Sequence, residues 1–252
     1  MHPQPTHDKQ EIRHRLNLDR EWSLYALADL DDELFEQCDW WTCGDGLALV
    51  FRGLRIRPIL VAGDASSTRD LLLALPERSG YLNLKPHQLD AAEGIYRYRE
   101  RHKMRRMIVE RFTPRSGTTE ILTLADLAEV DRFYASDDGA GVAFAPYQLA
   151  TGFFRGIRRD GELVAVAGVH VVSRNESVAG VGNILTRADW RGRGLAQTVT
   201  SAVVTALQEA GIRTIGLNVE YTNVAAIQAY ERIGFRSRFY YYEGVADRLQ
   251  AS

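Results

Sequence analysis

The stretch WRGRGLAQ, Trp190 to Gln197, places two arginines and two glycines in four consecutive positions, between a strand-like run and a helix-like pattern. The first N–H groups of a helix have no intrahelical partner, and glycine lets a ligand approach the backbone closely. The helix dipole and the guanidinium groups of Arg191 and Arg193 add positive potential. The pattern therefore predicts an anion site, for which a diphosphate is a natural occupant.

Two well-known phosphate loops do not fit this stretch. The sequence is not GxxxxGK[ST], and after Gly192 and Gly194 the third glycine position of GxGxxG is occupied by Gln197. A nucleoside triphosphate or NAD is therefore disfavoured. Taken alone, the stretch is about as consistent with an ordinary basic turn as with a ligand loop.

A second motif follows at the end of the chain. Asn223, Ala226, Tyr230, Gly234 and Phe235 form the pattern N-x-x-A-x-x-x-Y-x-x-x-G-F. Together with the earlier pattern R-x-x-G-x-A, which Arg191, Gly194 and Ala196 supply, the second half of the chain resembles the GNAT superfamily of acyl-CoA-dependent N-acyltransferases. The resemblance implies a GNAT fold, which is an α/β (α+β) fold with a mixed, mostly antiparallel sheet flanked by helices.

The resemblance also implies a cofactor site for acetyl-CoA or another short acyl-CoA. The diphosphate is expected on the backbone amides of Arg191, Gly192, Arg193, Gly194, Leu195, Ala196, Gln197 and Thr198. The pantetheine arm is expected beside Ile184, Leu185 and Thr186, for which plain strand pairing is the alternative. Asn223 is expected to contact the cofactor from the other side, although a pure N-cap role explains it nearly as well.

Tyr230 is the expected catalytic residue. Acyl transfer from a thioester to an amine needs a neutral amine, a donor for the oxyanion and a proton for the departing thiolate. Tyr230 lies nearly two helical turns after Asn223, so both side chains point to one face. A phenol can protonate the thiolate, and a core tyrosine is the alternative. The oxyanion donor is expected to be a backbone N–H near Leu185.

The general base is not evident. Many relatives carry a glutamate where alignment through Asn223 places Asn218, and an amide cannot act as a base. Glu220 is set aside on the parity of its strand, Glu176 lies at a turn, and His170 in VAVAGVHVVS reads more readily as a structural histidine. A proton relay through ordered water is a further possibility that the resemblance allows.

The elements around these residues follow from periodicity. The sequence predicts an amphipathic helix over LTLADLAEVDRFYAS, a hairpin through Asp160-Gly161, a strand at VAGVGNILT, a helix from Gly194 to Ala210, a strand at TIGLNV, a helix from Asn223 and a last strand at RFYYYEG. The order strand, glycine turn, helix, strand places the RGRG turn at a helix N-terminus.

The first half reads as a divergent, partial copy of the same fold. It contains the strand-like runs LALVF, RPILVAG and YLNL and the helix candidates TRDLLLALP and QLDAAEGIYRYRERH. Its equivalent turn reads DASSTRD, so this half is not expected to bind CoA. The arrangement resembles glycine N-acyltransferase-like proteins. We expect a tail or outer helix over 1–22, a divergent GNAT-like domain over 23–112 and the catalytic domain over 113–252.

Composition limits the function classes. The formal net charge is −2 and 45% of the 252 residues are hydrophobic, so nucleic acid is a poor candidate partner and the run RYRERHKMRRM, Arg97 to Met107, reads as a solvated face. No secretory signal or membrane span is evident, which predicts a cytoplasmic protein. Cys38 and Cys43 are expected to be reduced, buried thiols, without the partners that a zinc site requires.

The acceptor is expected to be a small-molecule or protein amine, and the sequence leaves the oligomeric state open. Candidate contacts are Asp137, Asp138, Phe144 and Tyr147, together with the run Tyr240 to Tyr242, while a solvent-exposed loop is the alternative. The sequence thus favours an N-acetyltransferase that transfers an acyl group directly to a primary amine. The alternatives are a catalytically inactive CoA-binding regulatory module and an acyltransferase for longer acyl-CoA.

Overall fold

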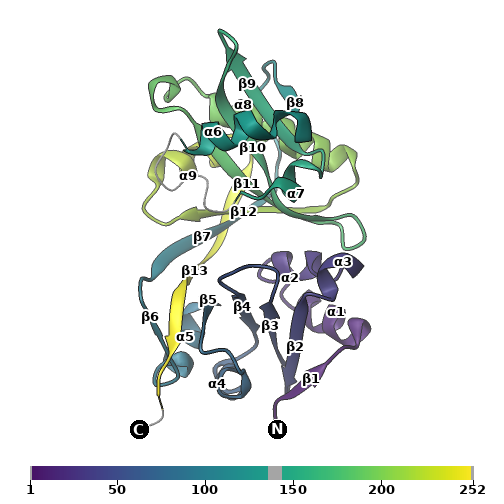
Figure 1. The fold of residues 1–252 in the computed structure, drawn as a ribbon, viewed down its shortest axis with the longest axis vertical. Helices are drawn as coiled ribbons and strands as arrows, with labels where there is room; N and C mark the ends of the chain where they lie inside the picture. Colours follow the sequence, from purple (N-terminus) through teal and green to yellow (C-terminus); the bar gives the residue numbers. More distant parts are fainter. Residues whose placement is uncertain (1, 136–143, 251–252) are drawn as a thin grey trace. The chain divides into compact units, whose positions relative to one another are not determined.

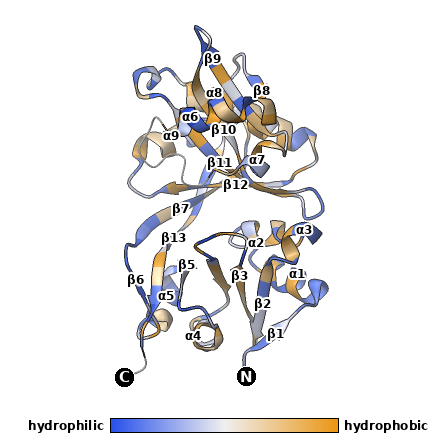
Figure 2. Cartoon of the chain, in the orientation of Figure 1, coloured by the Kyte–Doolittle hydropathy of each residue, from blue (hydrophilic) through white to orange (hydrophobic). Residues whose placement is uncertain are grey.

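Two separate hydrophobic cores divide the chain into two α/β units (Figure 1). The computed structural model describes residues 2–135 and 144–250. Unit 1 comprises Met1–Arg106 and Phe239–Ser252, and unit 2 comprises Met107–Arg238. Figure 2 shows mostly hydrophobic residues along the central strands of each unit, as expected for strands covered on both faces.

Unit 1 is built on a mixed sheet with the strand order β1-β2-β3-β4-β5-β13, and β6 also pairs with β13. Strands β4 and β5 are parallel and the other pairs are antiparallel. Its elements are β1 (Gln4–Thr6), α1 (Lys9–Asn17), α2 (Leu24–Ala28), α3 (Asp32–Phe35), β2 (Cys38–Cys43), β3 (Gly46–Phe51), β4 (Pro58–Ala62), α4 (Ala65–Ala74), β5 (Ser79–Leu84), α5 (Pro86–Ala92), β6 (Tyr96–Tyr98) and β7 (His102–Val109).

In unit 2 the strands follow the order β7-β12-β11-β10-β9-β8, with both parallel and antiparallel pairs. Strands β11 and β12 are parallel, whereas β8, β9, β10 and β11 are antiparallel to one another in turn. Its elements are β8 (Glu120–Leu122), η1 (Leu124–Asp126), α6 (Leu127–Ala135), α7 (Pro146–Leu149), β9 (Phe154–Arg159), β10 (Glu162–Ser173), β11 (Val178–Thr186), η2 (Ala188–Trp190), α8 (Leu195–Glu209), β12 (Thr214–Glu220), α9 (Val224–Arg232) and the first residues of β13 (Phe235–Arg248).

Apart from β6, which precedes the final strand of the first repeat, the two halves of the chain repeat one order of elements: a strand, short helices, three strands, a helix, a strand, a helix and a final strand. The final strands are exchanged between the repeats. Strand β13 ends the second repeat, yet Tyr242–Asp247 pair antiparallel with β5 in unit 1. Strand β7 ends the first repeat, and its last residues belong to unit 2, where β7 neighbours β12. The first half is therefore a divergent copy that is completed by the C-terminal strand.

Local sequence explains the elements next to the RGRG turn. Asp160 and Gly161 both have positive φ, as the tight turn between β9 and β10 requires. Helix α8 buries Val199, Val203 and Leu207 at helical spacing and ends before Gly211, whose φ is 83°. Both elements agree with the sequence prediction. Among the described residues, no helix is long and apolar enough to cross a membrane.

Three expectations differ from the structure. The helix predicted over QLDAAEGIYRYRERH is wrong beyond Ala92, because Gly94 adopts a φ of 79° and β6 follows. Residues 239–252, expected in the second domain, belong to unit 1 because β13 pairs with β5, and the division near the expected 112/113 boundary falls at 106/107. Within 1–22, α1 buries Ile12 and Leu16, so this segment is part of unit 1.

Candidate cofactor and active site

Strand β11 separates from β12 beside the predicted pantetheine residues. The parallel pairing covers Val178–Val181 with Thr214–Leu217 and is not found beyond these residues in the described part of the chain. On its other edge β11 continues to pair with β10, since Leu185 lies opposite Val166 and Thr186 opposite Ala165. The edge of β11 that carries Ile184, Leu185 and Thr186 is therefore not covered by β12, which leaves room for a ligand to pair with this strand.

A β-bulge lies where the strands separate. Asn183 has a φ of 53°, and the pairing of β10 with β11 shifts register between Gly182 and Leu185. Three side chains hold this residue: the Tyr134 hydroxyl donates to its carbonyl (2.5 Å), its N–H donates to His170 Nε2 (3.3 Å), and its Nδ2 donates to Gln148 Oε1 (2.9 Å). Side chains from α6, α7 and β10 thus hold this bulge, which sets the orientation of the backbone groups that follow it in β11.

His170 is a member of this network. Burial lowers the pKa of its imidazole to about 4, so the ring is neutral at pH 7. Because Nε2 accepts a hydrogen bond from the Asn183 N–H, the ring proton lies on Nδ1. The ring also packs on Gly182, where a Cβ would come within 2.3 Å of Nε2. These contacts favour the structural interpretation of His170 over a general base.

The RGRG turn forms the N-terminus of α8. Gly192 and Gly194 have φ values of 77° and 80°, which side chains rarely adopt. The Arg191 N–H donates to the Ala188 carbonyl (3.3 Å), and the next N–H that bonds back to the chain is that of Thr198, which donates to the Gly194 carbonyl (3.1 Å). Among the described residues, the N–H groups from Gly192 to Gln197 make no backbone hydrogen bond. A row of donors is thus left at the positive end of a 15-residue helix, as an anion site requires.

The arginine side chains of the turn fold onto neighbouring groups. Arg191 Nε donates to the Thr186 carbonyl (3.1 Å). Arg193 stacks over the Trp190 ring at 4.4 Å and donates to the Asp189 carbonyl (3.3 Å). Both residues are exposed, so their guanidinium groups add positive potential at the turn without being buried in it.

Gln197 and Thr198 are buried, and each is 6% exposed. Gln197 Oε1 accepts a hydrogen bond from Arg115 Nη1 (3.2 Å), and the Thr198 hydroxyl donates to the Gly194 carbonyl (3.4 Å). Gln197 therefore offers a ligand its backbone N–H rather than its side chain, whereas both the N–H and the hydroxyl of Thr198 donate to the Gly194 carbonyl. Sequence reasoning missed Arg115, which lies in the expected linker, because nothing in its local pattern marks it.

Helix α9 carries the second motif. The Asn223 side chain accepts a hydrogen bond from the Ala226 N–H (3.1 Å), so Asn223 is the N-cap of α9. Tyr230 is 7% exposed and packs against the Phe235 ring with a centroid distance of 6.0 Å. Burial raises the pKa of Tyr230. The hydroxyl consequently keeps its proton at neutral pH, which both a proton donor and a core tyrosine allow.

The candidates for a base lie on β12 and at a turn. Asn218 and Glu220 are separated by the buried Val219 and therefore share the less buried face of β12. The expectation that Glu220 and Asn218 lie on opposite faces of the strand is therefore wrong, because they are two positions apart. Glu176 is 8% exposed in the turn between β10 and β11, where its N–H donates to Ser173 Oγ (3.0 Å). Glu220 is therefore the carboxylate on the face of Asn218.

The expected acceptor contacts are spread over both units. Asp137 and Asp138 lie outside the described residues. In unit 2, Phe144 packs on the Tyr134 ring with a centroid distance of 5.1 Å, and Tyr147 is 54% exposed. The run Tyr240 to Tyr242 belongs to unit 1, where Tyr241 is buried.

The split strands and the glycine turn lie within a recognised family segment. Residues 121–235 match the acetyltransferase (GNAT) family, and they run from β8 to the start of β13. Unit 2 therefore contains a GNAT acetyltransferase domain, the domain of acyl-CoA-dependent transferases. The resemblance that the two motifs predicted is confirmed for this segment.

Solved structures extend the likeness to the whole chain. A putative acetyltransferase from the GNAT family of Novosphingobium aromaticivorans is 20% identical with a TM-score of 0.62, over 92% of this chain and 100% of that chain. A Drosophila protein is 15% identical with a TM-score of 0.73, over 99% of each chain. A tandem GNAT protein from the clavulanic acid biosynthesis pathway is 12% identical with a TM-score of 0.58, over 99% of each chain.

At these identities the structures show the fold, which is the predicted GNAT fold with a divergent N-terminal half. No curated protein matches the chain by sequence. The expected likeness to glycine N-acyltransferase-like proteins stays a prediction.

Proposed function

We propose that this protein is an N-acetyltransferase that moves an acetyl or other short acyl group from acyl-CoA directly to a primary amine. The observation that carries the proposal is the meeting of two features in unit 2: β11 leaves β12 after Val181, and the glycine turn opens α8 with its N–H donors unused. The first feature fits a pantetheine arm and the second fits a diphosphate. Acyl-CoA would supply the activated acyl group as a thioester.

The residues of the turn would hold the diphosphate through their backbone. Gly192, Arg193, Gly194, Leu195, Ala196 and Gln197 offer N–H groups that make no backbone hydrogen bond within the described part of the chain, whereas the N–H groups of Arg191 and Thr198 at the two ends of this run donate to the carbonyls of Ala188 and Gly194. Arg191 and Arg193 add charge. Ile184, Leu185 and Thr186 would pair with the pantetheine amides along the uncovered edge of β11. Asn223 would contact the cofactor while it caps α9.

Tyr230 would deliver the proton that the leaving thiolate needs. Its raised pKa keeps the phenol protonated, so it can act only as a donor at neutral pH. We expect Tyr230→Phe to keep the packing on Phe235 and the affinity for acetyl-CoA while kcat falls about 10²-fold or more. Unchanged kcat in this variant would show that Tyr230 is a core residue.

Glu220 would accept the proton of the amine, directly or through water. It shares the face of Asn218, the position at which the family pattern places a carboxylate. We expect Glu220→Gln to lower kcat and to remove the acidic limb of the pH–rate profile, whereas Asn218→Ala leaves that limb in place. An acidic limb that persists in Glu220→Gln would exclude this assignment.

The binding step is tested by thermal unfolding with acetyl-CoA, CoA and ATP. A ligand that binds only the folded state raises Tm, so both CoA species should raise it and ATP should not. Gly192 offers a matched pair of variants, because a Cβ there meets no atom within 4 Å and both Asn and Asp tolerate positive φ. We expect Gly192→Asp, which adds a negative charge at the turn, to lose the shift that Gly192→Asn retains.

A wild-type protein that neither CoA species stabilises would overturn the proposal. Equal shifts in Gly192→Asp and Gly192→Asn would overturn the placement of the diphosphate.

Asn218 favours a second candidate, a CoA-binding module without catalysis. The two candidates are separated by the release of free CoA from acetyl-CoA in the presence of a panel of primary amines. Binding without release for every amine and for Glu220→Gln alike would support the inactive module. The same assay with longer acyl-CoA tests whether the apolar Ile184 and Leu185 admit larger acyl groups.

A further inference from the structure

The segment Pro114–Gly117 lies against α8 next to the glycine turn, although it precedes the family segment that begins at residue 121. The Arg115 N–H donates to Ser201 Oγ (2.9 Å) and Arg115 Nη1 donates to Gln197 Oε1 (3.2 Å). A Cβ on Gly117 would come within 2.5 Å of Thr198 Cγ2. The first turns of α8 thus hold this segment through the backbone as well as the side chain of Arg115.

Arg115 also lies against the turn itself. A Cβ on Gly194 would meet Cζ of Arg115 at 2.6 Å and Nη2 at 2.7 Å, so the guanidinium group rests on the glycine backbone. Among the described residues, Gln197 Oε1 is the one acceptor on this side chain, which leaves donors on Nη2 and Nε for a ligand. A third arginine therefore stands at the proposed diphosphate site, in addition to Arg191 and Arg193.

A pocket of about 310 Å³ opens beside Arg115, between Pro114–Gly117 and the outer face of α8 from Thr198 to Glu209. Its volume is at the lower end of the range for small-molecule sites, roughly 300–1,000 Å³. Arg155 of β9 lines it as well, with Nη1 donating to the carbonyls of Gly152 and Phe154 (both 2.9 Å). Arg115 makes the pocket basic near the turn, whereas Arg155 lies close enough to Glu209 for the two charges to interact. The lining combines the hydroxyl side chains of Thr198, Ser201 and Thr205 with apolar groups such as Pro114 and Ala202.

We propose that this pocket binds the 3′-phosphoadenosine end of acyl-CoA and that Arg115 donates to the 3′-phosphate. The inference rests on the proposed function, because a diphosphate bound to the turn determines the position from which the attached adenosine extends. Arg115 touches Gly194 on one side and lines the pocket on the other, so it lies on the path between the two. A dianionic phosphate fits a guanidinium group with free donors.

The experiment compares the Kd of CoA with that of 3′-dephospho-CoA, which lacks only the 3′-phosphate. We expect wild type to bind CoA about 10- to 100-fold more tightly, as is typical of a hydrogen bond to a charged group. Arg115→Gln should bind both ligands with nearly equal affinity. Arg111→Gln is the matched control, because Arg111 is also an exposed arginine of the same connecting segment, and it should keep the wild-type preference.

A second pair of variants tests the pocket without changing Arg115. Thr205 lines the pocket one turn beyond Ser201. Thr205→Glu places a negative charge near the 3′-phosphate and should weaken CoA more than 3′-dephospho-CoA, whereas the neutral Thr205→Gln should preserve the preference.

The failure of this inference is distinct from that of the proposed function. If wild type binds CoA and 3′-dephospho-CoA equally, or if Arg115→Gln weakens both ligands by the same factor, the pocket does not bind the 3′-phosphate while the CoA site stands. If wild type binds neither ligand, the proposed function itself fails.

Discussion

The two units contain the same strand–turn–helix–strand arrangement, yet the turns differ. In unit 2, Gly192 and Gly194 lead into α8 and its first donors stay open. In unit 1, Asp64 leads into α4, and its carboxylate accepts hydrogen bonds from the Ser67 N–H (2.8 Å) and hydroxyl (2.7 Å). A carboxylate of the chain thus occupies the helix N-terminus of unit 1, where an external anion would otherwise bind.

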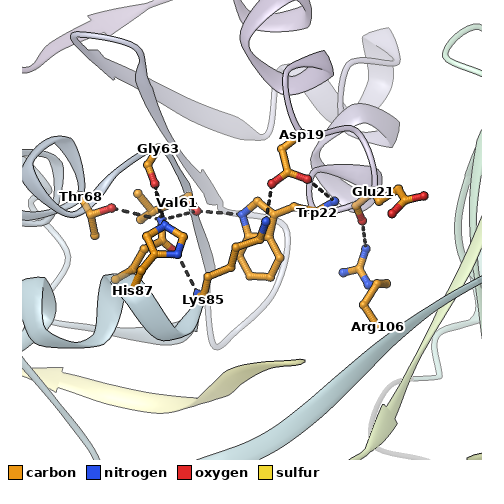
Figure 3. A network of polar contacts seen from close by, with 10 residues as sticks. Asp19, Glu21, Trp22, Val61, Gly63, Thr68, Lys85, His87 and Arg106 are labelled. Atoms are coloured by element: carbon orange, nitrogen blue, oxygen red, sulfur yellow. Dashed lines mark hydrogen bonds and ion pairs between the residues drawn. The ribbon is translucent and has the colours of Figure 1, made fainter. Parts of the chain in front are cut away.

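The strand edges beside the turns also differ, and Figure 3 shows the edge of unit 1. In unit 1, parallel pairing of β4 with β5 covers Pro58–Leu60, and the next carbonyls receive donors from side chains. Trp22 Nε1 donates to the Val61 carbonyl (2.9 Å), and Gln88 Nε2 donates to the carbonyls of Val61 and Gly63 (both 3.2 Å). Among the described residues, no side chain bonds to the backbone of Ile184 or Leu185 in β11.

Other side chains stabilise the residues that bond to the end of β4. Lys85 forms an ion pair with Asp19 and lies 5.4 Å from the Trp22 ring centroid, while Arg106 donates to the Glu21 carbonyl (2.7 Å), as Figure 3 shows. Unit 1 therefore satisfies with its own side chains the carbonyls of Val61 and Gly63, whereas the backbone of Ile184 and Leu185 in unit 2 receives no such bond from the described side chains. One order of elements can thus have its helix N-terminus and strand edge filled by the chain itself or left open, depending on a few residues at the turn and along the strand edge.

The first prediction concerns stoichiometry and has the largest expected effect. If unit 1 is closed, isothermal titration should find one equivalent of acetyl-CoA per chain. Gly192→Asp, which gives the unit 2 turn a carboxylate as at Asp64, should leave no binding at all. Two equivalents in wild type would show that unit 1 binds the cofactor as well, and one equivalent remaining in Gly192→Asp would show that binding does not depend on the unit 2 turn.

The second prediction concerns Trp22, which bonds to the end of β4 in unit 1. Trp22 is 2% exposed and packs its ring against Tyr241 at 5.4 Å. Trp22→Ala should lower the free energy of unfolding by about 3–5 kcal/mol, measured by urea denaturation with circular dichroism. Trp22→Phe keeps most of the ring contact and loses one hydrogen bond, so about 1 kcal/mol is expected. Equal losses in both variants would mean that the hydrogen bond to Val61, rather than ring burial, dominates.

The third prediction uses the bulge, which β11 has and β4 lacks, since β4 pairs with β3 without a register shift. The folded-state pKa of His170, about 4, is below its ordinary value of 6.5. As the pH falls, His170 therefore becomes protonated in the unfolded chain before it does so in the folded chain. The stability that is present above pH 6.5 is consequently lost as the pH falls towards 4. Between pH 7 and pH 5 this loss should be about 2 kcal/mol.

His170→Gln is the matched variant for this measurement, because its amide oxygen can still accept from the Asn183 N–H and does not titrate in this range. Its free energy of unfolding should lack this pH-dependent component. Parallel pH curves for wild type and His170→Gln would show that the ring is not buried as a neutral group.

The comparison also shows which features could be predicted from sequence. The glycine turn, the Asp160-Gly161 hairpin and the Asn223 cap are encoded within a few residues, since they depend on φ preferences and local hydrogen bonds. The absence of a glycine turn in DASSTRD correctly marked unit 1 as different. These local signals were enough to predict the GNAT fold and the cofactor residues that the proposed function uses.

The remaining features depend on contacts between distant residues. The exchange of β13 into unit 1 joins residues 79–84 to 242–247, and no periodicity records such a pairing. Arg115 reaches the turn across 82 positions in the sequence through Gln197, and Trp22 reaches β4 across 39. An arginine in a linker and a tryptophan near a terminus carry no local mark of these partners, so only the structure shows them.

The smallest expected effect concerns Asp64. Hydrogen bonds from the Ser67 side chain and backbone lower the pKa of its carboxyl below the ordinary value of 3.8. Its stabilising contribution is thus present above pH 3.8 and is lost as the pH falls below it. Asp64→Ala should lower Tm by about 1–3 °C, with a difference from wild type that is constant from pH 7 to pH 5. Asp64→Asn, which still caps α4, should show a smaller loss.

Removal of this carboxylate should not create a second cofactor site. In Asp64→Ala the carbonyls of Val61 and Gly63 still accept from Trp22 and Gln88, so the edge of β4 stays closed. Titration of Asp64→Ala should therefore still find one equivalent of acetyl-CoA. A second equivalent would show that the helix N-terminus alone, and not the covered strand edge, decides which unit binds.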